Sequence, residues 1–312
     1  MRLYRTLAAL ERQHGPVARV VTIGVFDGLH LGHQEILRRT KELAAAAGAR
    51  TTVCSFEPTP GEHFAPDNPP PRLTCLRERV ELIDAWGIAE MFCPRFEAVR
   101  DLTPEFFIAH LLVDGLHVNH VVVGHDFRFG AGRKGTLEDL RAGGLRFGFG
   151  VTTVEPVFWR NERISSTAIR RALKAGDLAS AKSMLGRDYA MSGRVVHGRG
   201  LGKDLGFPTA NVNLKRRLAP VDGIFAVRVT GLADGPLDGV ASVGNRPMLG
   251  GGKTLLEVYL FDFDRDIYGQ YITVNFVARL REERVFVDLR AMQAQMHLDV
   301  RAAQAALHAG IA

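Results

Sequence analysis

The chain has 312 residues, of which 46% are hydrophobic and 24% charged, and it carries a formal net charge of +6 at pH 7. This length exceeds what one compact core usually organises, so two domains are expected, and the absence of any apolar stretch approaching about eighteen residues excludes a membrane span. The positive charge invites a nucleic-acid partner, but the basic residues are scattered among acidic ones, and an anionic small substrate explains the charge equally well.

The first half of the chain alternates strand-like and helix-like segments. Apolar β-branched runs are each followed by a segment whose apolar residues recur at helical spacing. This alternation is typical of a parallel sheet with helices between its strands. We therefore expect strands at 19–26, 50–56, 120–124 and 151–154, helices at 34–47, 76–86 and 136–146, and two short helices that end near residue 185.

The most informative motif, GVFDGLHLGH at residues 24–33, follows the first strand and opens the first helix. Ligands of parallel sheets bind at the carboxyl ends of strands, where helix N-termini offer N–H groups to phosphate. Gly28 and Gly32 allow close approach of a ligand, and His30 and His33 supply hydrogen-bond donors. The motif predicts phosphoryl or nucleotidyl transfer. Alternatively, the glycines serve a tight turn while the histidines cap the helix or bind a metal.

A second segment, ISSTAIR at residues 164–170, places three hydroxyl groups at another helix N-terminus. Ser165, Ser166 and Thr167 at that position, with Arg170 one turn further, can hold a triphosphate tail. A simple helix cap is the alternative interpretation.

A third segment, GHDFRFG at residues 124–130, again lies at the carboxyl end of a strand. Phe127 and Phe129 can flank a planar ring, with Asp126 as a polar contact. The alternative is a turn whose aromatic side chains fold back into the core. The proline-rich stretch 58–71 is expected to be a long irregular loop that covers a site.

From residue 190 the pattern changes to strands separated by glycine and proline clusters. Such a pattern indicates an antiparallel barrel, and the last segment has the apolar spacing of a helix that packs against it. We expect strands at 223–231, 239–244, 254–263 and 271–280, and a helix at 288–308.

Two features of this second half point to chemistry. Residues 193–211 are rich in glycine and basic residues, as in a loop that wraps phosphate, and in an extended chain Thr209 and Asn211 point to one side, where they can meet magnesium. A turn-rich loop without a ligand is the alternative.

Glu257 shares a strand face with Leu255, Tyr259 and Phe261. Phosphorylation of an alcohol needs a group that takes or orients the hydroxyl proton, and a positioned carboxylate does this in kinases. Glu257 is our candidate for this role. Alternatively, Glu257 faces water on a solvated surface of the sheet.

The motifs of the first half, with Phe56-Glu57-Pro58-Thr59-Pro60, resemble the FMN adenylyltransferase domain of bacterial bifunctional riboflavin kinase/FAD synthetases over residues 20–185. The H-x-G-H signature is His30 to His33, and the S-S-T-x-I-R signature is Ser165 to Arg170. The resemblance implies that the two histidines steady the α-phosphate of ATP, and that Ser165, Ser166, Thr167 and Arg170 hold pyrophosphate. It implies ATP contacts for Gly24, Phe26, Asp27, Gly28 and Gly32, and flavin contacts for Pro58, Asp126, Phe127 and Phe129. His125 stands where many relatives have an acidic residue.

The second half is similar to the riboflavin kinase domain of the same family from about residue 193 to the terminal helix, with GFPTAN at 206–211 as its signature. The resemblance implies phosphate contacts for Gly198, Gly202, Lys203, Gly206 and Pro208, magnesium ligands in Thr209 and Asn211, and a catalytic role for Glu257. Lys203 stands where relatives usually have arginine. Met248 stands where relatives commonly have a threonine after the proline.

The resemblance therefore implies an α/β nucleotidyltransferase domain, with a Rossmann-like parallel sheet, at 1–186, followed by an antiparallel β-barrel riboflavin kinase domain with a C-terminal helix at 187–312. It implies ATP-dependent phosphorylation of riboflavin to FMN, then adenylyl transfer to FMN giving FAD and pyrophosphate, with Mg²⁺ as cofactor. Riboflavin, FMN, FAD and ATP are the expected partners of a monomer or weak homo-oligomer that binds neither nucleic acid nor membrane.

Two other functions remain open at this point. A class I aminoacyl-tRNA synthetase also uses an H-x-G-H motif, but the chain lacks a K-M-S-K-S-like loop. A non-catalytic nucleotide- or RNA-binding protein on the same scaffold is the other.

The cysteines and the N-terminus bear on location. Cys54, Cys75 and Cys93 are odd in number and widely spaced, which predicts buried reduced thiols rather than a disulfide framework or a zinc site. Residues 1–5 lack the apolar run of a signal peptide, so we expect the cytoplasm.

Overall fold

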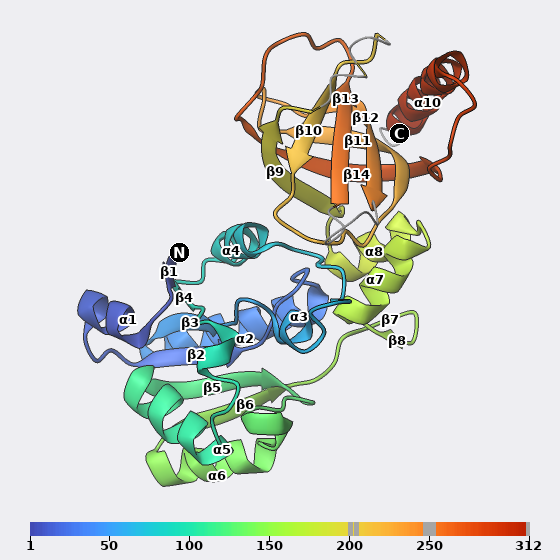
Figure 1. Cartoon of the computed structure of the whole chain (residues 1–312). Coiled ribbons are helices and arrows are strands. Elements are labelled where there is room, and N and C mark those ends of the chain that lie inside the picture. The colour runs from blue at the N-terminus through green and yellow to red at the C-terminus, as the bar shows by residue number, and fades with distance from the viewer. Residues whose placement is uncertain (199–201, 203–205, 246–253, 310–312) are drawn as a thin grey trace. The chain divides into compact units, whose positions relative to one another are not determined.

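The computed structural model describes residues 1–198, 202, 206–245 and 254–309 (Figure 1). Its chain forms two compact units by internal contacts, the first made of Met1–Pro70 and Leu76–Ser165, the second of Pro71–Cys75 and Ser166–Ala312. The expected domain limits, 1–186 and 187–312, stay a prediction. Within the described ranges no helix has both the length and the apolar character needed to cross a membrane.

The first unit is built on a six-stranded sheet in the order β1-β4-β3-β2-β5-β6, and every neighbouring pair is parallel. The parallel sheet expected from the sequence is thus confirmed. Its outer strand β1 and the short β4 escaped prediction because three residues carry too little periodicity. The strands are β1 (Arg2–Tyr4), β2 (Arg19–Ile23), β3 (Arg50–Cys54), β4 (Glu90–Phe92), β5 (Val118–Gly124) and β6 (Gly150–Val154).

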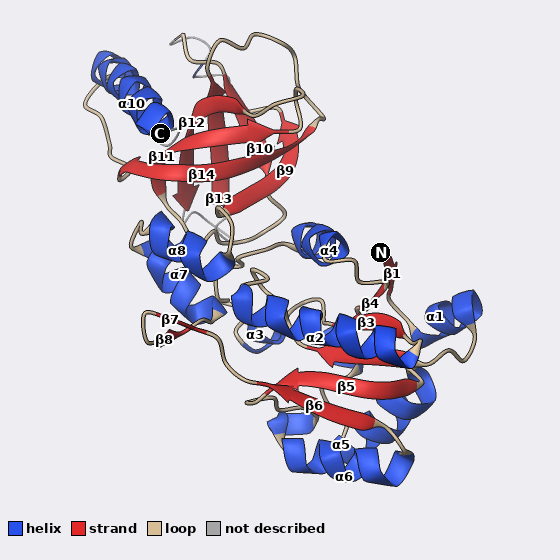
Figure 2. Ribbon diagram, turned by 180° about the vertical axis from the view of Figure 1, so that it is seen from behind, coloured by secondary structure: helices blue, strands red, loops and turns tan. Residues whose placement is uncertain are grey.

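Both faces of this sheet are covered by helices, as expected from the burial of all of β2 and of residues 121–123 in β5. Alternate residues serve opposite faces: Val21 belongs to a core cluster with Leu111 and Leu140, whereas Val20 packs with Ala44. Figure 2 shows α2 lying over one face. The helices are α1 (Leu7–His14), α2 (Leu31–Ala47), α3 (Pro60–Phe64), α4 (Leu76–Ala85), α5 (Pro104–Phe106), the π-helical η2 (Phe107–Gly115) and α6 (Leu137–Phe147), with short 3-10 turns η1 (Phe96–Ala98) and η3 (Ala131–Arg133).

The second unit contains a closed antiparallel barrel in the order β10-β13-β12-β11-β14-β9. The predicted barrel is confirmed, and so are the two short helices before it and the helix that ends the chain. Their bounds are α7 (Ser166–Lys174), α8 (Leu178–Leu185), β9 (Ala190–Val196), β10 (Thr209–Asn213), β11 (Gly223–Thr230), β12 (Leu237–Asn245), β13 (Thr254–Leu260), β14 (Tyr271–Arg281) and α10 (Leu289–Ala309).

Strand β13 divides its side chains strictly between the two faces of the barrel wall. Leu256, Val258 and Leu260 are at most 5% exposed and fill the interior. Glu257 and Tyr259 point to the outer side, where they line a pocket together with α10. The barrel core and the candidate site thus use alternate residues of one strand.

The structure also differs from the sequence expectation at several element boundaries and in short elements. Strands β2 and β3, for example, end at Ile23 and Cys54 rather than at residues 26 and 56. Helix α2 begins at Leu31 rather than at 34, because His30 caps its N-terminus. The stretch 58–71, expected to be irregular, contains α3, which is stabilised by a capping box between Thr59 and Glu62. A short hairpin of β7 (Phe158–Trp159) and β8 (Glu162–Arg163) precedes α7.

A buried ion cluster ties together the amino ends of β2, β3 and β4. Glu90 accepts hydrogen bonds from Arg19 Nε (2.8 Å), Arg50 Nε (2.6 Å) and Thr52 Oγ1 (3.0 Å). Burial alone would raise the pKa of Glu90, but the hydrogen bond and charge of Arg19, with the bonds from Arg50 and Thr52, lower it below the ordinary 4.5. Since Arg19 and Glu90 are both fully buried, each depends on the other for its charge.

We expect Glu90→Gln to destabilise the first unit by about 3–5 kcal/mol, because the guanidinium of Arg19 then stays buried without a counter-ion. Both tryptophans of the chain, Trp86 and Trp159, lie in this unit, so urea unfolding followed by tryptophan fluorescence reports on it alone. A folded-state pKa below the unfolded one stabilises the fold above pH 4.5 and ceases to do so as the pH falls through the lowered value. The difference between variant and wild type should therefore shrink in acid.

The control for this prediction is Glu42→Gln on the exposed face of α2, where Glu42 pairs with Arg38 and Arg39. Exposed pairs contribute at most about 1 kcal/mol. An equal effect of the two substitutions at pH 7 would contradict the assigned role of Glu90.

Candidate active sites

The first candidate site lies where the order of the sheet reverses. From β2 the chain continues through α2 to β3 on one side, whereas β5 pairs with the other side of β2. Such a switch point leaves a crevice at the carboxyl ends of the two strands. A hollow of about 190 Å³ opens there, lined by residues that follow β2, β5 and β6.

The two histidines of the predicted motif face this hollow as a stacked pair. Their ring centroids are 3.6 Å apart with an interplanar angle of 16°. His30 Nδ1 accepts the backbone N–H of His33 (3.3 Å), so a neutral His30 carries its proton on Nε2. Burial, followed by the nearby His30, lowers the pKa of His33 well below 6.5. His33 is therefore neutral at pH 7, and its buried Nδ1 has no hydrogen-bond partner among the described residues.

The turn before these histidines holds them in place. Phe26, at a positive φ of 54°, packs its ring 5.1 Å from that of His33. A Cβ on Gly32 would lie 3.3 Å from the His30 ring, so a larger residue there would press on this histidine. Gly24, Phe26, His30, Gly32 and His33 all line the hollow. Asp27 and Gly28 belong to the same turn but are not among its lining residues.

The loop after β5 contributes Asp126 and Phe127 to the same hollow. Partial burial would raise the pKa of Asp126, but the hydrogen bond and charge of Arg163 (2.8 Å) lower it. Phe127 stacks on Phe129 with ring centroids 5.6 Å apart. Phe129 itself is 5% exposed and packs in the core against Phe107.

The S-S-T-x-I-R segment is shared between the two units. Ser165 lines the hollow beside the histidines. Ser166, Thr167 and Arg170 begin α7 in the second unit, where Arg170 Nε donates to the carbonyl of Pro71 (2.7 Å). The three hydroxyl-bearing residues thus do not belong to a single compact unit.

The loop that carries Pro58 leads into a small aromatic cluster. Phe64 at the end of α3 is 71% exposed and lies edge-on to Phe96, with centroids 5.6 Å apart. Phe64 thus presents an apolar ring at the surface, close in sequence to the loop that carries Pro58. Sequence reasoning missed Phe64, and its position six residues after Pro58 is the available signal.

The second candidate site lies on the outer face of the barrel. In the register of the strands, Glu257 on β13 stands directly between Asn211 on β10 and Ser242 on β12. Directly opposed residues of antiparallel strands point to one face, with Cα atoms about 4.5–5.5 Å apart. The next row places Thr209 beside Tyr259. Glu257 and Thr209, predicted separately, thus line one cavity of about 450 Å³.

Helix α10 closes the other side of this cavity. Asp299 accepts hydrogen bonds from Arg281 Nε (2.8 Å) and Arg281 Nη2 (2.6 Å), and a third from Gln295 (2.8 Å). Met292 and Met296 from the same helix supply apolar wall. Sequence reasoning missed Arg281 and Asp299. The sequence signal for Asp299 is that it is a single acidic residue on the otherwise apolar face of the terminal helix.

Two described glycines before β10, Gly198 and Gly202, lie close to the predicted magnesium residues. A Cβ on Gly198 would lie 2.0 Å from the Asn211 side chain, and one on Gly202 3.1 Å from Thr209 Oγ1. Gly206 adopts a positive φ of 83°, and Pro208 follows the buried Phe207. The predicted phosphate contact Lys203 and the departure at Met248 lie outside the described residues.

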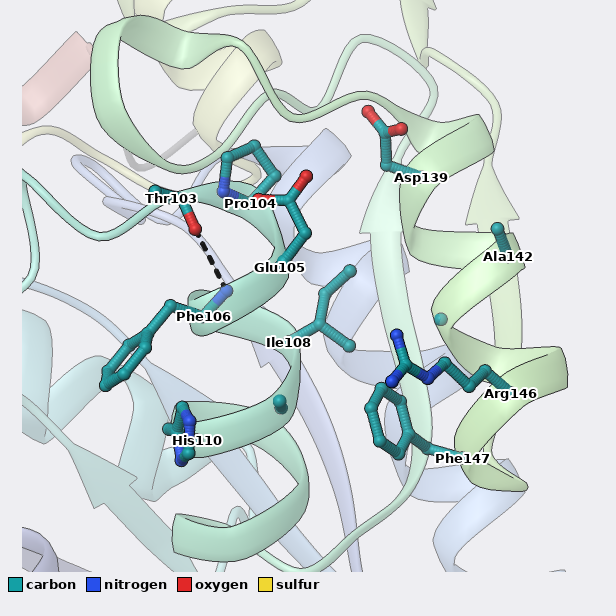
Figure 3. A pocket seen from close by; sticks show the side chains of 12 residues that line it. Thr103, Pro104, Glu105, Phe106, Ile108, His110, Asp139, Ala142, Arg146 and Phe147 are labelled. Carbon is teal, nitrogen blue, oxygen red and sulfur yellow. Dashed lines mark hydrogen bonds between the residues drawn. The ribbon is translucent and has the colours of Figure 1, made fainter.

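A third hollow, of about 470 Å³, lies in the first unit between α5–η2 and α6 (Figure 3). Ile108 lies between the two walls, and the guanidinium of Arg146 lies 5.0 Å from the ring centroid of Phe147. None of the residues predicted for a site lines it.

Comparison with known proteins covers both halves of the chain. The FAD synthetase family model matches residues 13–168, and the riboflavin kinase model matches residues 185–307. The bifunctional riboflavin kinase/FMN adenylyltransferase of Escherichia coli (strain K12) is 45% identical over 278 residues, 89% of each chain. That of Pseudomonas fluorescens is 42% identical over 300 residues, 95% of each chain. A crystal structure described as a macrolide-efflux protein from Streptococcus pneumoniae has 31% identity and a TM-score of 0.78, covering 93% of this chain and 94% of that one.

Proposed function

The chain belongs to the bifunctional riboflavin kinase/FMN adenylyltransferase family, and we propose how its two sites divide that chemistry. The enzyme phosphorylates riboflavin to FMN and adenylylates FMN to FAD, with ATP as the donor in both reactions. The comparisons give no support to an aminoacyl-tRNA synthetase or a non-catalytic nucleotide- or RNA-binding protein. The proposed kinase site is the barrel cavity around Glu257, and the proposed adenylyl site is the hollow around His30 and His33.

The observation that carries the kinase assignment is the row Asn211, Glu257 and Ser242 across three strands. A carboxylate at this position, next to a cavity of ligand size, is suited to accept the proton of a riboflavin hydroxyl as it attacks the γ-phosphorus of ATP. Tyr259 and the methionines of α10 offer apolar surface to the flavin ring. Gly198, Gly202, Lys203, Gly206 and Pro208 are proposed to wrap the phosphates.

The oxygen donors of this site fit a magnesium ion. Thr209 and Asn211 present hard hydroxyl and amide oxygens, and magnesium takes few protein ligands because phosphates and waters complete its shell. The close approach of Gly198 and Gly202 to these two side chains supports a tight cradle. When bound, the ion neutralises phosphate charge, while Thr209 and Asn211 fix its position relative to Glu257.

The adenylyl site needs donors rather than a base. A phosphate monoester is already largely dianionic at neutral pH, so the FMN phosphate attacks the α-phosphorus of ATP without losing a proton. We propose that His30 and His33 stabilise the negative charge that develops on the α-phosphate. The departing pyrophosphate is held by Ser165, Ser166, Thr167 and Arg170. The proposed nucleotide contacts are Gly24, Phe26, Asp27, Gly28 and Gly32. The proposed flavin contacts are Pro58, Asp126 and Phe127, whereas the buried Phe129 supports the Phe127 ring from the core. The exposed Phe64 is added as a stacking surface.

The proposed setting of the enzyme is the cytoplasm. Its three cysteines are buried and free, as is usual in a reducing compartment. We propose a monomer or weak homo-oligomer that acts without nucleic acid or membrane.

Incubation of the pure protein with riboflavin, ATP and magnesium is expected to yield FMN first and then FAD, separated by chromatography. Chelation of the metal by EDTA should suppress FMN formation at least about tenfold, and added magnesium should restore it. Failure of both flavins to accumulate would refute the assignment. FMN formation that withstands EDTA would refute the magnesium site alone.

A further inference from the structure

Arg79 on α4 is a buried cation that belongs to none of the sequence motifs. Its side chain is 1% exposed. Nη1 donates to the carbonyl of Val25 (2.9 Å), and Nη2 donates to the carbonyl of Phe56 (3.2 Å) and to Glu57 Oε2 (2.8 Å). A guanidinium in a fully buried position is costly unless its bonds are well formed, so its location requires an explanation.

The partners of Arg79 belong to two loops that the proposed adenylyl reaction needs. Val25 lies in the turn after β2, which continues to Phe26 and His30. Phe56 and Glu57 follow β3 and directly precede Pro58. Because β2 and β3 are parallel neighbours, both loops leave the sheet at the same edge, and Arg79 bonds the backbone of one to the backbone of the other.

The fork of the guanidinium is what makes this connection possible. Its donors lie in a fixed plane, so the directions of the bonds to the Val25 and Phe56 carbonyls are set relative to each other. A lysine ammonium keeps the charge beside Glu57 but is a single point, which does not hold both carbonyls in this geometry. The carboxylate of Glu57 compensates the charge and holds the fork in place.

We infer that Arg79 is a positioning residue for adenylyl transfer, which fixes the distance between the nucleotide-binding turn and the flavin-binding loop. The inference rests on the proposed adenylyl site. An error of about 1 Å in the approach of two reactants costs as much as about 100-fold in rate. Loosening the hydrogen bonds of Arg79 therefore slows the attack of the FMN phosphate on ATP.

The chain offers a closely matched control in Arg19. Like Arg79 it is fully buried, and it also donates to one carboxylate, Glu90, and to two backbone carbonyls, Val17 and Leu116. It lies at the opposite, amino end of the strands in the same unit. Arg19→Lys thus imposes a comparable structural loss without touching either loop.

The test compares Arg79→Lys, Arg19→Lys and the milder Glu57→Gln in the full-length enzyme. FAD formation from FMN and ATP is measured per folded first unit, with the folded fraction taken from tryptophan fluorescence, and FMN formation from riboflavin serves as the internal standard. Arg79→Lys should lower kcat/KM for FMN in FAD formation about 10- to 100-fold. Glu57→Gln should lower it less, and Arg19→Lys should stay within about twofold. FMN formation should be unchanged in all three.

Equal losses in Arg79→Lys and Arg19→Lys would show a purely structural role and overturn the inference. So would a normal kcat/KM in folded Arg79→Lys. A wild-type enzyme that forms no FAD would refute the proposed function instead, so the two failures are distinguishable. A kcat that falls at saturating FMN, with Arg19→Lys unaffected, supports positioning of bound reactants.

Discussion

Glu257→Gln is expected to abolish FMN formation while FAD formation from supplied FMN continues at the wild-type rate. Glutamine keeps the size of the side chain but does not accept a proton. Since loss of a general base typically costs about 10²–10⁴-fold, the kinase rate should fall by that factor. Parallel assays of the two half-reactions, one started with riboflavin and the other with FMN, measure both rates on one preparation.

The control for this variant is Asp238→Asn on β12. Asp238 is paired with Arg228 on the same barrel but lies outside the cavity. It should leave both rates unchanged. Retention of more than about one hundredth of the kinase rate by Glu257→Gln would contradict its role as general base, because removal of an essential base costs at least about 100-fold.

The reverse pattern is expected for His30→Asn. Asparagine is a good N-cap residue, so α2 keeps its cap while the Nε2–H donor is lost. Removal of one donor aimed at a developing oxyanion costs about 10²–10³-fold, and FAD formation should fall by this amount. The riboflavin-started reaction should then stop at FMN, which accumulates and is read directly from the chromatogram.

His110→Asn provides the comparison for this variant, since His110 is 55% exposed and pairs with Asp114 away from the hollow. Parallel loss of both activities in folded His30→Asn would argue against two independent sites. Unchanged FAD formation would remove His30 from the reaction.

Periodicity and turn chemistry were sufficient to predict the two architectures. The glycine- and hydroxyl-rich segments led to the two candidate sites, whose roles stay a prediction. The alternation along β13 correctly separated Glu257 from the interior residues. The register that sets Glu257 beside Asn211 was not readable, because strand pairing depends on contacts between distant parts of the chain. Phe129 shows a similar limit: its spacing matched that of Phe127, but only packing against Phe107 decides that it is buried.

Arg79, Arg163 and Arg281 were missed for a different reason. An arginine in a helix or strand is usually a solvated side chain, and nothing in the local sequence distinguishes these three from the rest. Their roles arise from carbonyl and carboxylate groups that other segments bring to them. The terminal helix illustrates the point, since its apolar spacing was recognised while the acidic Asp299 within it was not.

The strict alternation along β13 determines which mutations such an enzyme tolerates during evolution. Because the interior side chains and the candidate site residues Glu257 and Tyr259 occupy separate positions of one strand, a substitution on the outer face changes the candidate site without opening a void inside the barrel. The same arrangement makes the strand intolerant of length changes. Insertion or deletion of one residue would turn leucine and valine outward and Glu257 inward, so fold and catalysis would be lost together.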